Sequence, residues 1–388
     1  MNNKKYYIVL LAIFLMMAIY SAIIMMNKVI PATAFGETEI KSSAKAMSVI
    51  EVNSGRILSQ KNQNTRLAMA STTKIMTALV TIENTKNFDE IVKIDKRAIG
   101  IEGTSIYLTD KENLTVKELL YGLMLASGND ASVALASYIG DGNIDKFIEK
   151  MNNKATEIGA YNTHFANPHG LDDDNHYTTA YDLAIIAGEA IKNPIFREIV
   201  STKRITISGN EKVEARYLKN KEKLLNIYDG CIGVKTGFTD NAGRCNVSAV
   251  EKDNMLVVCV VLNCPDMFEE SVRLLDEVFS KYTMENIIPK DNFICEMQVE
   301  GGKKVNTKLF SEKEFNYPLT ENEKSLIIIK KDLPEKLIAP IKKENAVGTI
   351  MVELNNKIIY KGSIYSIDNI EKEYIKGEID DIIDNWAY

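Results

Sequence analysis

The sequence predicts an α+β fold in two parts, a mixed domain of strands and helices followed by a smaller all-β domain. Strand-like segments stand at 44–60 and 204–262, and helical patterns occupy the interval between them. From about Asp291, short β-rich segments alternate with turn residues, which is the pattern of a small all-β domain. We expect the mixed domain to span 37–288 and the all-β domain 289–366.

Each element of the mixed domain has a local signal. The apolar segments 44–51 and 56–60 flank a turn, which predicts a hairpin, and apolar residues at helical spacing follow Ser71. Thr115 and Glu118 have the spacing of a capping box, which predicts a helix over the stretch to residue 126. Further helices are expected at 131–138, 179–191 and 268–282, and further strands at 204–207, 212–217, 247–250 and 255–262.

The C-terminal part is predicted from strand-like runs and one helical pattern. Apolar residues from Ile370 to Trp386 recur near helical spacing between mostly acidic residues, which predicts an amphipathic helix over 367–388. The β-rich runs are 293–299, 305–309, 325–330, 346–354 and 357–365.

Length, amino-acid composition and net charge exclude several classes of protein. The 388 residues suggest two or three domains, and 45% hydrophobic with 26% charged residues is a globular balance. The net charge of -6, without a dense basic stripe, argues against a nucleic-acid partner. Five cysteines, an odd number, leave at least one thiol unpaired within the chain. The sequence contains no Cys/His cluster of the kind that would predict a metal or cofactor site.

The N-terminus predicts export. A short basic start is followed by an uncharged stretch, 6–26, long enough to span a bilayer as a helix. Small residues at Ala32 and Ala34 then have the spacing of a signal-peptide cleavage site. Residues 1–36 are therefore a signal peptide or an N-terminal membrane segment, and the rest of the chain is expected outside the cytoplasmic membrane.

Three short sequence motifs together indicate one type of reaction. They are Ser71-Thr72-Thr73-Lys74, Ser127-Gly128-Asn129 and Lys235-Thr236-Gly237, which read S-x-x-K, S-x-N and K-T-G. Each triplet alone is common, but the ordered trio is typical of penicillin-binding proteins and class A β-lactamases. It indicates acyl transfer through a serine ester, activated by a lysine.

The residue types fit that reaction. Ser71 is the expected nucleophile, and Lys74, one helical turn away, is the expected general base if burial and nearby cations depress its pKa. Lys235 would supply one such positive charge, and Ser127 would carry a proton to the leaving amine. Asn129 offers a donor and an acceptor to orient a peptide backbone.

The segment after Lys235 is expected to bind substrate. Thr236 can bond a carboxylate, and Gly237 would let the substrate backbone lie flat against the strand. The N–H groups of Ser71 and Phe238 would stabilise an oxyanion. The three histidines, His164, His169 and His176, lack the surroundings of a Ser-His-Asp triad, and His169 is expected to be structural.

Around these motifs the chain resembles the serine D-alanyl-D-alanine carboxypeptidases, the low-molecular-mass penicillin-binding proteins. The likeness covers about 41–365 and is carried by four segments: 70–77, 125–131, 167–172 and 233–244. It implies a β-lactamase/transpeptidase-like core, an antiparallel sheet flanked by helices with a helical subdomain, and a β-rich C-terminal domain.

The resemblance also implies partners and one further residue. The substrate would be the peptidoglycan stem peptide, β-lactam antibiotics would be covalent inhibitors, and the N-terminal segment or the C-terminal helix would contact the membrane. Lys221 would help to hold the terminal carboxylate of the substrate. Phe238 stands where many members carry histidine, so only its backbone role is expected here.

Two other functions share parts of this pattern. Class A β-lactamases use an S-D-N triplet and a deacylating glutamate on a separate loop; here Gly128 replaces the aspartate. A penicillin-sensing or wall-binding domain would acylate slowly and release no D-alanine, but it would not need both lysines.

Overall fold

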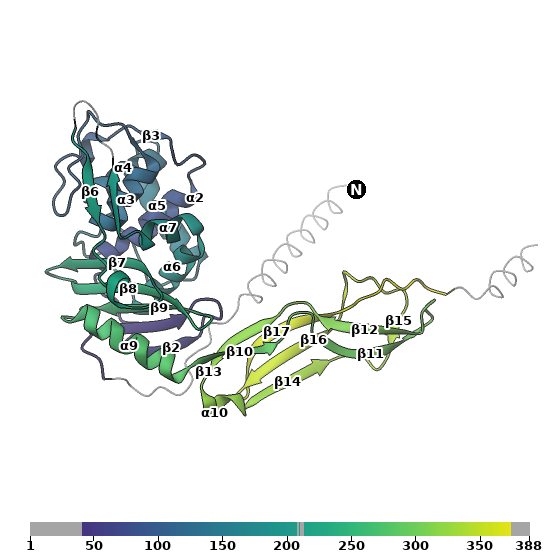
Figure 1. The fold of residues 1–388 in the computed structure, drawn as a ribbon. Coiled ribbons are helices and arrows are strands. Elements are labelled where there is room, and N and C mark those ends of the chain that lie inside the picture. Colours follow the sequence, from purple (N-terminus) through teal and green to yellow (C-terminus); the bar gives the residue numbers. More distant parts are fainter. Residues whose placement is uncertain (1–40, 208, 210–212, 374–388) are drawn as a thin grey trace, which may run out of the picture.

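The computed structural model describes residues 41–207, 209 and 213–373. Figure 1 shows a mixed domain of helices and strands, from whose base a narrower C-terminal domain extends sideways. The expected signal or membrane segment, 1–36, and residues 374–388 of the expected C-terminal helix lie outside the described residues. Among the described residues, none of the helices combines the length and apolar character needed to cross a membrane.

The mixed domain is built on a five-stranded antiparallel sheet. Its strands, in spatial order, are β2 (Ile57–Lys61), β1 (Ala46–Glu51), β9 (Met255–Leu262), β8 (Gly243–Lys252) and β7 (Cys231–Thr239). The expected strands 247–250 and 255–262 pair as the hairpin of β8 and β9, although β8 begins earlier and ends later than expected. Asp253 and Asn254 both have positive φ angles at its turn, as a tight two-residue hairpin requires.

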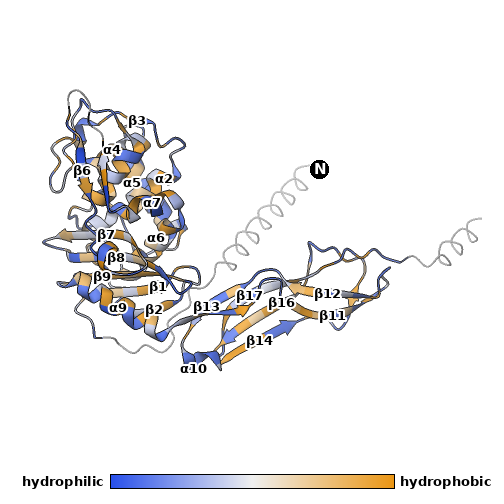
Figure 2. Cartoon of the chain, in the orientation of Figure 1, coloured by the Kyte–Doolittle hydropathy of each residue, from blue (hydrophilic) through white to orange (hydrophobic). Residues whose placement is uncertain are grey.

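Strand β9 is apolar throughout because both faces of the sheet are covered. Val258 and Val260 pack into the core under the helical subdomain, whereas Val257, Cys259 and Val261 pack against the other cluster, which includes α9. Helix α9 lies on the face of the sheet opposite α6 and α7, and Figure 2 shows the apolar strands between these layers.

The helical subdomain lies between β2 and β7 in the chain. Its helical elements are η1 (Ala70–Thr73), α2 (Lys74–Glu83), η2 (Lys96–Ala98), α3 (Val116–Tyr121), η3 (Gly122–Ala126), α4 (Asn129–Ile139), α5 (Ile144–Glu157), α6 (Ala180–Lys192), α7 (Pro194–Ser201) and α8 (Leu224–Ile227). One more helix of the mixed domain, α9 (Met267–Lys281), follows β9 and lies outside this subdomain. Its short strands are β3 (Ile91–Val92), β4 (Leu114–Thr115), β5 (Arg204–Ile207) and β6 (Arg216–Lys219).

Several details differ from the expected elements. The capping box of Thr115 and Glu118 is present, but the helix behind it changes at Gly122 from α3 to the π-helical turn η3. Strand β6 begins at Arg216, later than expected. Helices α5 and α7 were not expected, although Asn143 and Asn193 cap them with side-chain hydrogen bonds.

The C-terminal domain is all-β apart from one helical turn. Its elements are β10 (Thr283–Ile288), β11 (Phe293–Glu300), β12 (Asn306–Ser311), β13 (Phe315–Leu319), α10 (Glu321–Lys324), β14 (Ile327–Asp332), β15 (Leu337–Ile338), β16 (Ala346–Leu354) and β17 (Lys357–Ser366). Six strands form a sheet in the order β14-β16-β17-β12-β11-β15, and β10 pairs with β13.

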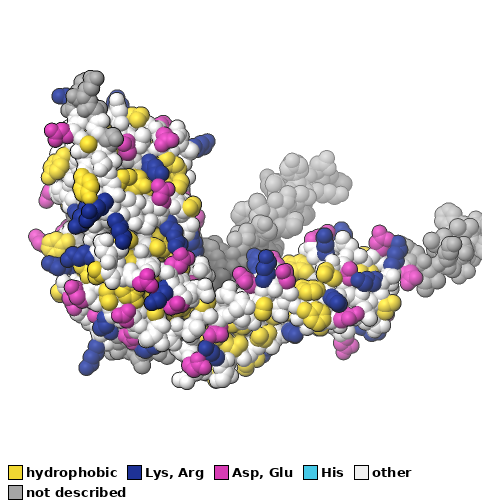
Figure 3. Space-filling model, in the orientation of Figure 1, with side chains coloured by type: hydrophobic (Ala, Val, Ile, Leu, Met, Phe, Trp, Pro, Cys, Tyr) yellow, Lys and Arg dark blue, Asp and Glu magenta, His cyan; other side chains and the backbone are white. Residues whose placement is uncertain are grey.

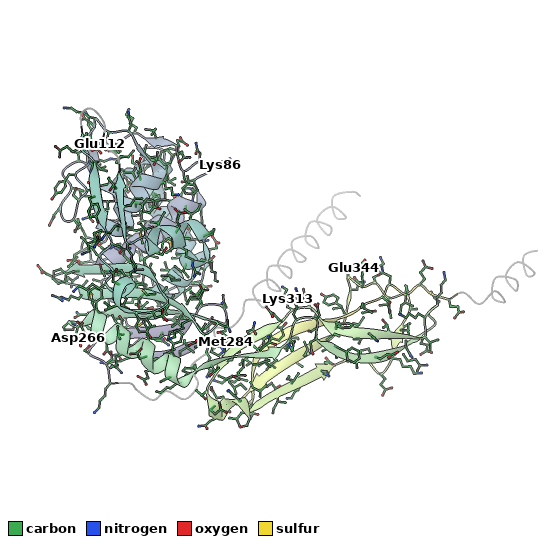
Figure 4. The ribbon with its side chains drawn as sticks, viewed as in Figure 1. Lys86, Glu112, Asp266, Met284, Lys313 and Glu344 are labelled. Carbon is green, nitrogen blue, oxygen red and sulfur yellow. The ribbon has the colours of Figure 1, made fainter. Side chains whose placement is uncertain are left out.

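The boundaries of the C-terminal domain differ from those expected. Because β10 pairs with β13, the segment 283–288 belongs by its hydrogen bonds to this domain and not to the mixed domain. At the other end, Ile370 forms a β-bridge with Ile341 and is buried, so the expected helix does not begin at residue 367. Figure 4 shows Met284, on β10, at the junction of the two domains.

Arg56 joins the two domains. It lies just before β2, is 4% exposed, and its guanidinium pairs with Glu323 of α10 at 2.5 Å. The same group donates to the carbonyl of Pro318 and stacks over the rings of Tyr282 and Tyr317, with centroid distances of 5.0 and 5.1 Å.

All five cysteines are free thiols. Within the described ranges, no group of three or more His, Cys, Asp or Glu side chains is arranged to hold a metal ion. Figure 3 shows Lys/Arg and Asp/Glu side chains interspersed over the visible face.

Candidate active site

The S-x-x-K segment forms a tight turn that leads into a buried helix. Ser71 lies in the 3-10 turn η1, and α2 begins only at Lys74, three residues later than expected. The Nζ atom of Lys74 lies 2.9 Å from Oγ of Ser71. The i, i+3 spacing therefore brings the amine to the hydroxyl as the sequence predicts.

Lys74 is fully buried and has two other polar contacts. Its Nζ atom lies 2.7 Å from Oδ1 of Asn129 and 2.6 Å from the carbonyl oxygen of His169. Both oxygens can only accept hydrogen bonds. A neutral amine has two N–H groups for these two acceptors, so its lone pair is left to face the hydroxyl of Ser71.

The electrostatic surroundings favour that neutral form. Burial lowers the pKa of Lys74 well below its ordinary value, and the positive charges of Lys235 and Lys221 lower it further. The carboxylate of Asp130 opposes this effect. Both burial and the neighbouring charges thus favour the neutral amine, which is the form that a general base requires.

The loop 167–171 supplies the carbonyl for Lys74. At Gly170, whose φ is +90°, a Cβ atom would lie 1.9 Å from the carbonyl oxygen of Ala70, so only glycine allows this approach. Thr77 donates to the carbonyl of Pro168 at 2.6 Å and fixes the loop to α2. His169 contributes to the loop with both its backbone and its side chain: its carbonyl accepts from Lys74, and its Nδ1 accepts the N–H of Leu171 at 3.2 Å.

His176 supports the nucleophile turn, a role that the sequence analysis missed. Its Nδ1 accepts the N–H of Ala166 at 3.0 Å, so its Nε2 carries the proton and donates to Oγ1 of Thr73 at 2.7 Å. Thr73 in turn donates to the carbonyl of Ala70 at 2.8 Å. Burial lowers the pKa of His176 to about 4, so the ring is neutral at neutral pH.

The S-x-N segment follows the π-helical turn. Ser127 has a φ of +67°, a left-handed conformation that is unusual for a residue other than glycine. Next to it, a Cβ atom at Gly128 would lie 2.7 Å from Oδ1 of Asp130. An S-D-N triplet would therefore require Asp130 to move, although this carboxylate holds the N–H groups of Ile106 and Leu108.

Lys235 reaches the same site from β7. Its Nζ atom donates to Oγ of Ser127 at 3.0 Å and to the carbonyl of Thr236 at 2.8 Å. Burial lowers the pKa of Lys235 to about 7, and the nearby charge of Lys221 acts in the same direction. Lys235 thus acts on both other motifs: it forms a hydrogen bond with Ser127, and its charge lowers the pKa of Lys74.

The glycine of K-T-G allows β7 to approach the nucleophile turn. A Cβ atom at Gly237 would lie 3.0 Å from the backbone nitrogen of Ser71 and 3.1 Å from the carbonyl of Met69. This explanation differs from the expected one, in which Gly237 made room for substrate. It also brings the N–H of Ser71 close to the segment that contains Phe238.

The remaining predicted residues lie at the same strand or next to it. Thr236 and Phe238 alternate with Lys235 and Gly237 along β7, and the ring of Phe238 is 62% exposed. Lys221 is an exposed residue just before α8, and its charge lowers the pKa of both Lys74 and Lys235. The structure therefore places all nine predicted residues in or beside one site.

Comparisons with known proteins agree with this arrangement. Residues 33–266 match the family described as D-alanyl-D-alanine carboxypeptidase (Peptidase_S11), and residues 282–372 match the penicillin-binding protein 5 C-terminal domain. D-alanyl-D-alanine carboxypeptidase DacF of Bacillus subtilis is 33% identical over 344 residues, which cover 86% of this chain and 88% of the relative.

A second relative and a solved structure match about the same share of this chain as DacF does. D-alanyl-D-alanine carboxypeptidase DacA of Haemophilus influenzae is 31% identical, over 89% of this chain and 90% of the relative. The crystal structure of penicillin-binding protein 5 from Haemophilus influenzae superimposes with a TM-score of 0.74 at 29% identity, covering 87% of this chain and all of that one. The chain belongs to the D-alanyl-D-alanine carboxypeptidase family of serine hydrolases.

Proposed function

We propose that this protein removes the terminal D-alanine from peptidoglycan stem pentapeptides through an acyl-enzyme on Ser71. The 2.9 Å separation of the Ser71 hydroxyl from the buried amine of Lys74 carries this proposal. Ser71 attacks the carbonyl carbon of the penultimate D-alanine as its proton passes to Lys74. The N–H groups of Ser71 and Phe238 stabilise the oxyanion of the tetrahedral intermediate.

The intermediate collapses when the leaving amine receives a proton. That proton passes from Lys74 to the amine by way of Ser127, whose hydroxyl is held by Lys235. The C–N bond breaks, D-alanine leaves, and a serine ester remains. Water then attacks the ester, with Lys74 again accepting a proton, and regenerates Ser71.

The other residues would hold the substrate. Lys235 and Thr236, both on β7, and Lys221, whose charge acts on Lys235, would attract its terminal carboxylate. Asn129 orients the peptide amide, which requires its present bond to Lys74 to be exchanged or shared. A β-lactam presents the same carboxylate and a strained amide, so it would acylate the same serine.

The first test compares the full chain with its Ser71→Ala variant, and Ser201→Ala serves as a control serine outside the site. We expect D-alanine release from a stem pentapeptide, and covalent labelling by a fluorescent penicillin, to vanish only in Ser71→Ala. Penicillin labelling that persists in Ser71→Ala would contradict the assignment of the nucleophile.

The same assay separates the other two functions. Rapid steady-state hydrolysis of penicillin by the wild type would favour a β-lactamase. Acylation without any release of D-alanine would favour a sensor, or an endopeptidase that acts on cross-linked wall.

We propose further that the enzyme acts at the outer face of the cytoplasmic membrane, on the cell wall. The uncharged stretch 6–26 and the small residues after it support export. Fusion of residues 1–60 to alkaline phosphatase should give activity that is lost when residues 6–26 are deleted. Membrane pelleting of the full chain, with and without residues 374–388, tests the C-terminal segment as an anchor.

A further inference from the structure

Arg216 is a largely buried arginine outside the catalytic motifs, and the mechanism above gives it no role. It begins β6, and its side chain is 14% exposed. Its guanidinium pairs at 2.6 Å with the carboxylate of Glu112, which Figure 4 labels near the top of the mixed domain. It also donates to the carbonyl oxygens of Ile106 at 2.5 Å and Tyr107 at 2.9 Å. The planar group with its five donors thus holds three points of the loop 102–112.

The hairpin that carries Arg216 is anchored in the protein. Ile207 on β5 and Leu218 on β6 are both buried in the core cluster under the helical subdomain. Strand β6 also packs against η3, the π-helical turn that leads to Ser127. Arg216 therefore reaches the loop from an element that buried apolar contacts hold in place.

The same loop is bonded to the S-x-N segment. The carboxylate of Asp130 accepts the N–H groups of Ile106 and Leu108, each at 3.0 Å. The N–H of Asn129 donates to the carbonyl of Thr104 at 2.7 Å. The loop therefore connects β6 on one side with the segment of Asn129 on the other.

The loop also orients the side chain of Asn129. The Nδ2 atom of this amide donates to the carbonyl of Glu102 at 2.7 Å, and its Oδ1 lies 2.7 Å from Nζ of Lys74. Gly103, with a φ of +87°, comes so close that a Cβ atom there would lie 2.7 Å from the same Nδ2. The position of the loop thus determines the direction of the amide, and the amide contacts the general base.

Tyr107 shows why the loop needs such support. Its φ of +60° is a left-handed conformation that is unusual for a residue other than glycine, and its side chain is 81% exposed, so packing of the ring does not hold it. Its N–H donates to Oγ of Ser105 at 2.9 Å, and its carbonyl accepts from Arg216. A conformation of this kind persists only when its surroundings fix it, and Arg216 supplies part of that restraint.

We propose that Arg216 is a positioning residue for the carboxypeptidase reaction: it holds the loop 102–112 against the S-x-N segment and so keeps the Asn129 amide in contact with Lys74. The inference rests on the proposed function, in which Lys74 is the general base. Arg216 acts through the loop and through Asn129.

The test is a double-mutant cycle between Arg216 and Asn129, with full-chain variants that release D-alanine from a stem pentapeptide. Arg216→Ala alone should lower kcat/KM about ten-fold, since small displacements of catalytic groups slow reactions on this scale. In an Asn129→Ala background the same change should cost less than about two-fold, because the side chain through which it acts is gone. A merely structural role would give the same loss in both backgrounds. Acylation by a fluorescent penicillin, followed over hours, extends the cycle to slow variants.

Gly103→Ala disturbs the loop from its other end and serves as a second variant if Arg216→Ala folds poorly. The new methyl group would lie 2.7 Å from Nδ2 of Asn129, so we expect a comparable loss. In the Asn129→Ala background, where that atom is absent, the loss should again fall below about two-fold. Gly100→Ala is the matched control. Its φ is +74°, but nothing lies within 4 Å of the Cβ position, so it adds backbone strain without the contact and should keep wild-type activity.

Two arginine variants complete the set. Arg216→Lys keeps a cation for Glu112, but one ammonium group cannot also reach both carbonyls in the geometry of a guanidinium, so it should restore only part of the activity. Arg197→Ala removes an arginine on α7 that pairs with Glu251, and it should behave as the wild type.

Losses that multiply in the variant carrying both Arg216→Ala and Asn129→Ala would overturn the proposal, as would wild-type activity in a folded Arg216→Ala. Failure of the proposed function is distinct from these outcomes, since the wild type itself would then release no D-alanine.

Discussion

The side-chain amide oxygen of Asn129 lies 2.7 Å from Nζ of Lys74. The amide nitrogen of the same side chain donates to the carbonyl of Glu102, also at 2.7 Å. Asn129 was expected to orient substrate, but in the structure both ends of its amide are engaged within the protein. It therefore fixes the position of the general base as well as offering groups to a peptide.

We predict that Asn129→Asp slows acylation near neutral pH and moves its pH optimum upward. A carboxylate in contact with Lys74 favours the ammonium form and so raises the pKa of that lysine, which leaves less of the free base. The measurement is the rate of penicillin acylation between pH 6 and 10, where we expect a loss of about ten-fold at pH 7 that shrinks as the pH rises.

Asn162→Asp is the control for added negative charge. Its side chain accepts a hydrogen bond from exposed Arg66 at 3.1 Å, away from Lys74. This variant should keep the wild-type profile. A rate loss in Asn129→Asp that does not change with pH would contradict the electrostatic explanation.

We predict that Gly237→Ala slows acylation by about 100-fold, the scale of a lost oxyanion donor. The new methyl group would lie 3.0 Å from the backbone nitrogen of Ser71, and backbone cannot yield as a flexible side chain can. Gly188→Ala on α6 is the control, since its nearest contact would be an ordinary 3.4 Å to Val52. Wild-type acylation by Gly237→Ala would show that the two segments adjust freely.

Local patterns were sufficient for much of the fold and for the residues of the site. The capping box at Thr115, strand β9 and helix α9 follow from neighbours in sequence, so the pattern alone predicted them, whereas β8 was predicted only over 247–250. The three motifs predicted that Ser71 and Lys235 would meet, because the chemistry requires it.

What the sequence analysis missed depends on contacts between distant segments. The pairing of β10 with β13, the bond from His176 to Thr73 and the ion pair of Arg216 with Glu112 have no signal within their own stretches. Helix α5 is a different case. Its cap at Asn143 and its buried Phe147 and Met151, four residues apart, were visible in the sequence, and the interpretation passed over them.

We predict that the protein loses stability as the pH falls from about 6.5 towards 4, in part because of His176. Its folded pKa of about 4 lies below the ordinary value of 6.5, because the buried ring binds a proton less readily than in the unfolded chain. Its contribution is therefore fully present above pH 6.5 and is lost as the pH falls, by roughly 3 kcal/mol in all.

Urea unfolding at several pH values measures this loss. His176→Gln can still accept from Ala166 and donate to Thr73, but it does not titrate, so its stability should fall less steeply over the same range. His164→Gln, at an exposed histidine, is the control and should keep the wild-type slope. Equal slopes in wild type and His176→Gln would rule out this histidine as a source of acid sensitivity.

We predict that Arg56→Ala loosens the C-terminal domain without slowing the reaction on a small peptide. The change leaves the carboxylate of Glu323 without its 2.5 Å partner and removes the stacking on Tyr282 and Tyr317. Breaking a buried pair of this kind costs about 3 kcal/mol. Because Arg56 joins the domains, we expect two separated unfolding transitions in calorimetry and faster proteolysis near 282–290.

The control for this prediction is Lys303→Ala, which removes an exposed ion pair with Glu371 inside the C-terminal domain. Exposed pairs contribute little, so this variant should unfold like the wild type. A single transition at the wild-type temperature in Arg56→Ala would mean that β10 and the chain connection alone hold the domains together. Slower release of D-alanine from a soluble pentapeptide would instead mean that the C-terminal domain supports the active site, which lies at β7, on the opposite edge of the sheet from β2.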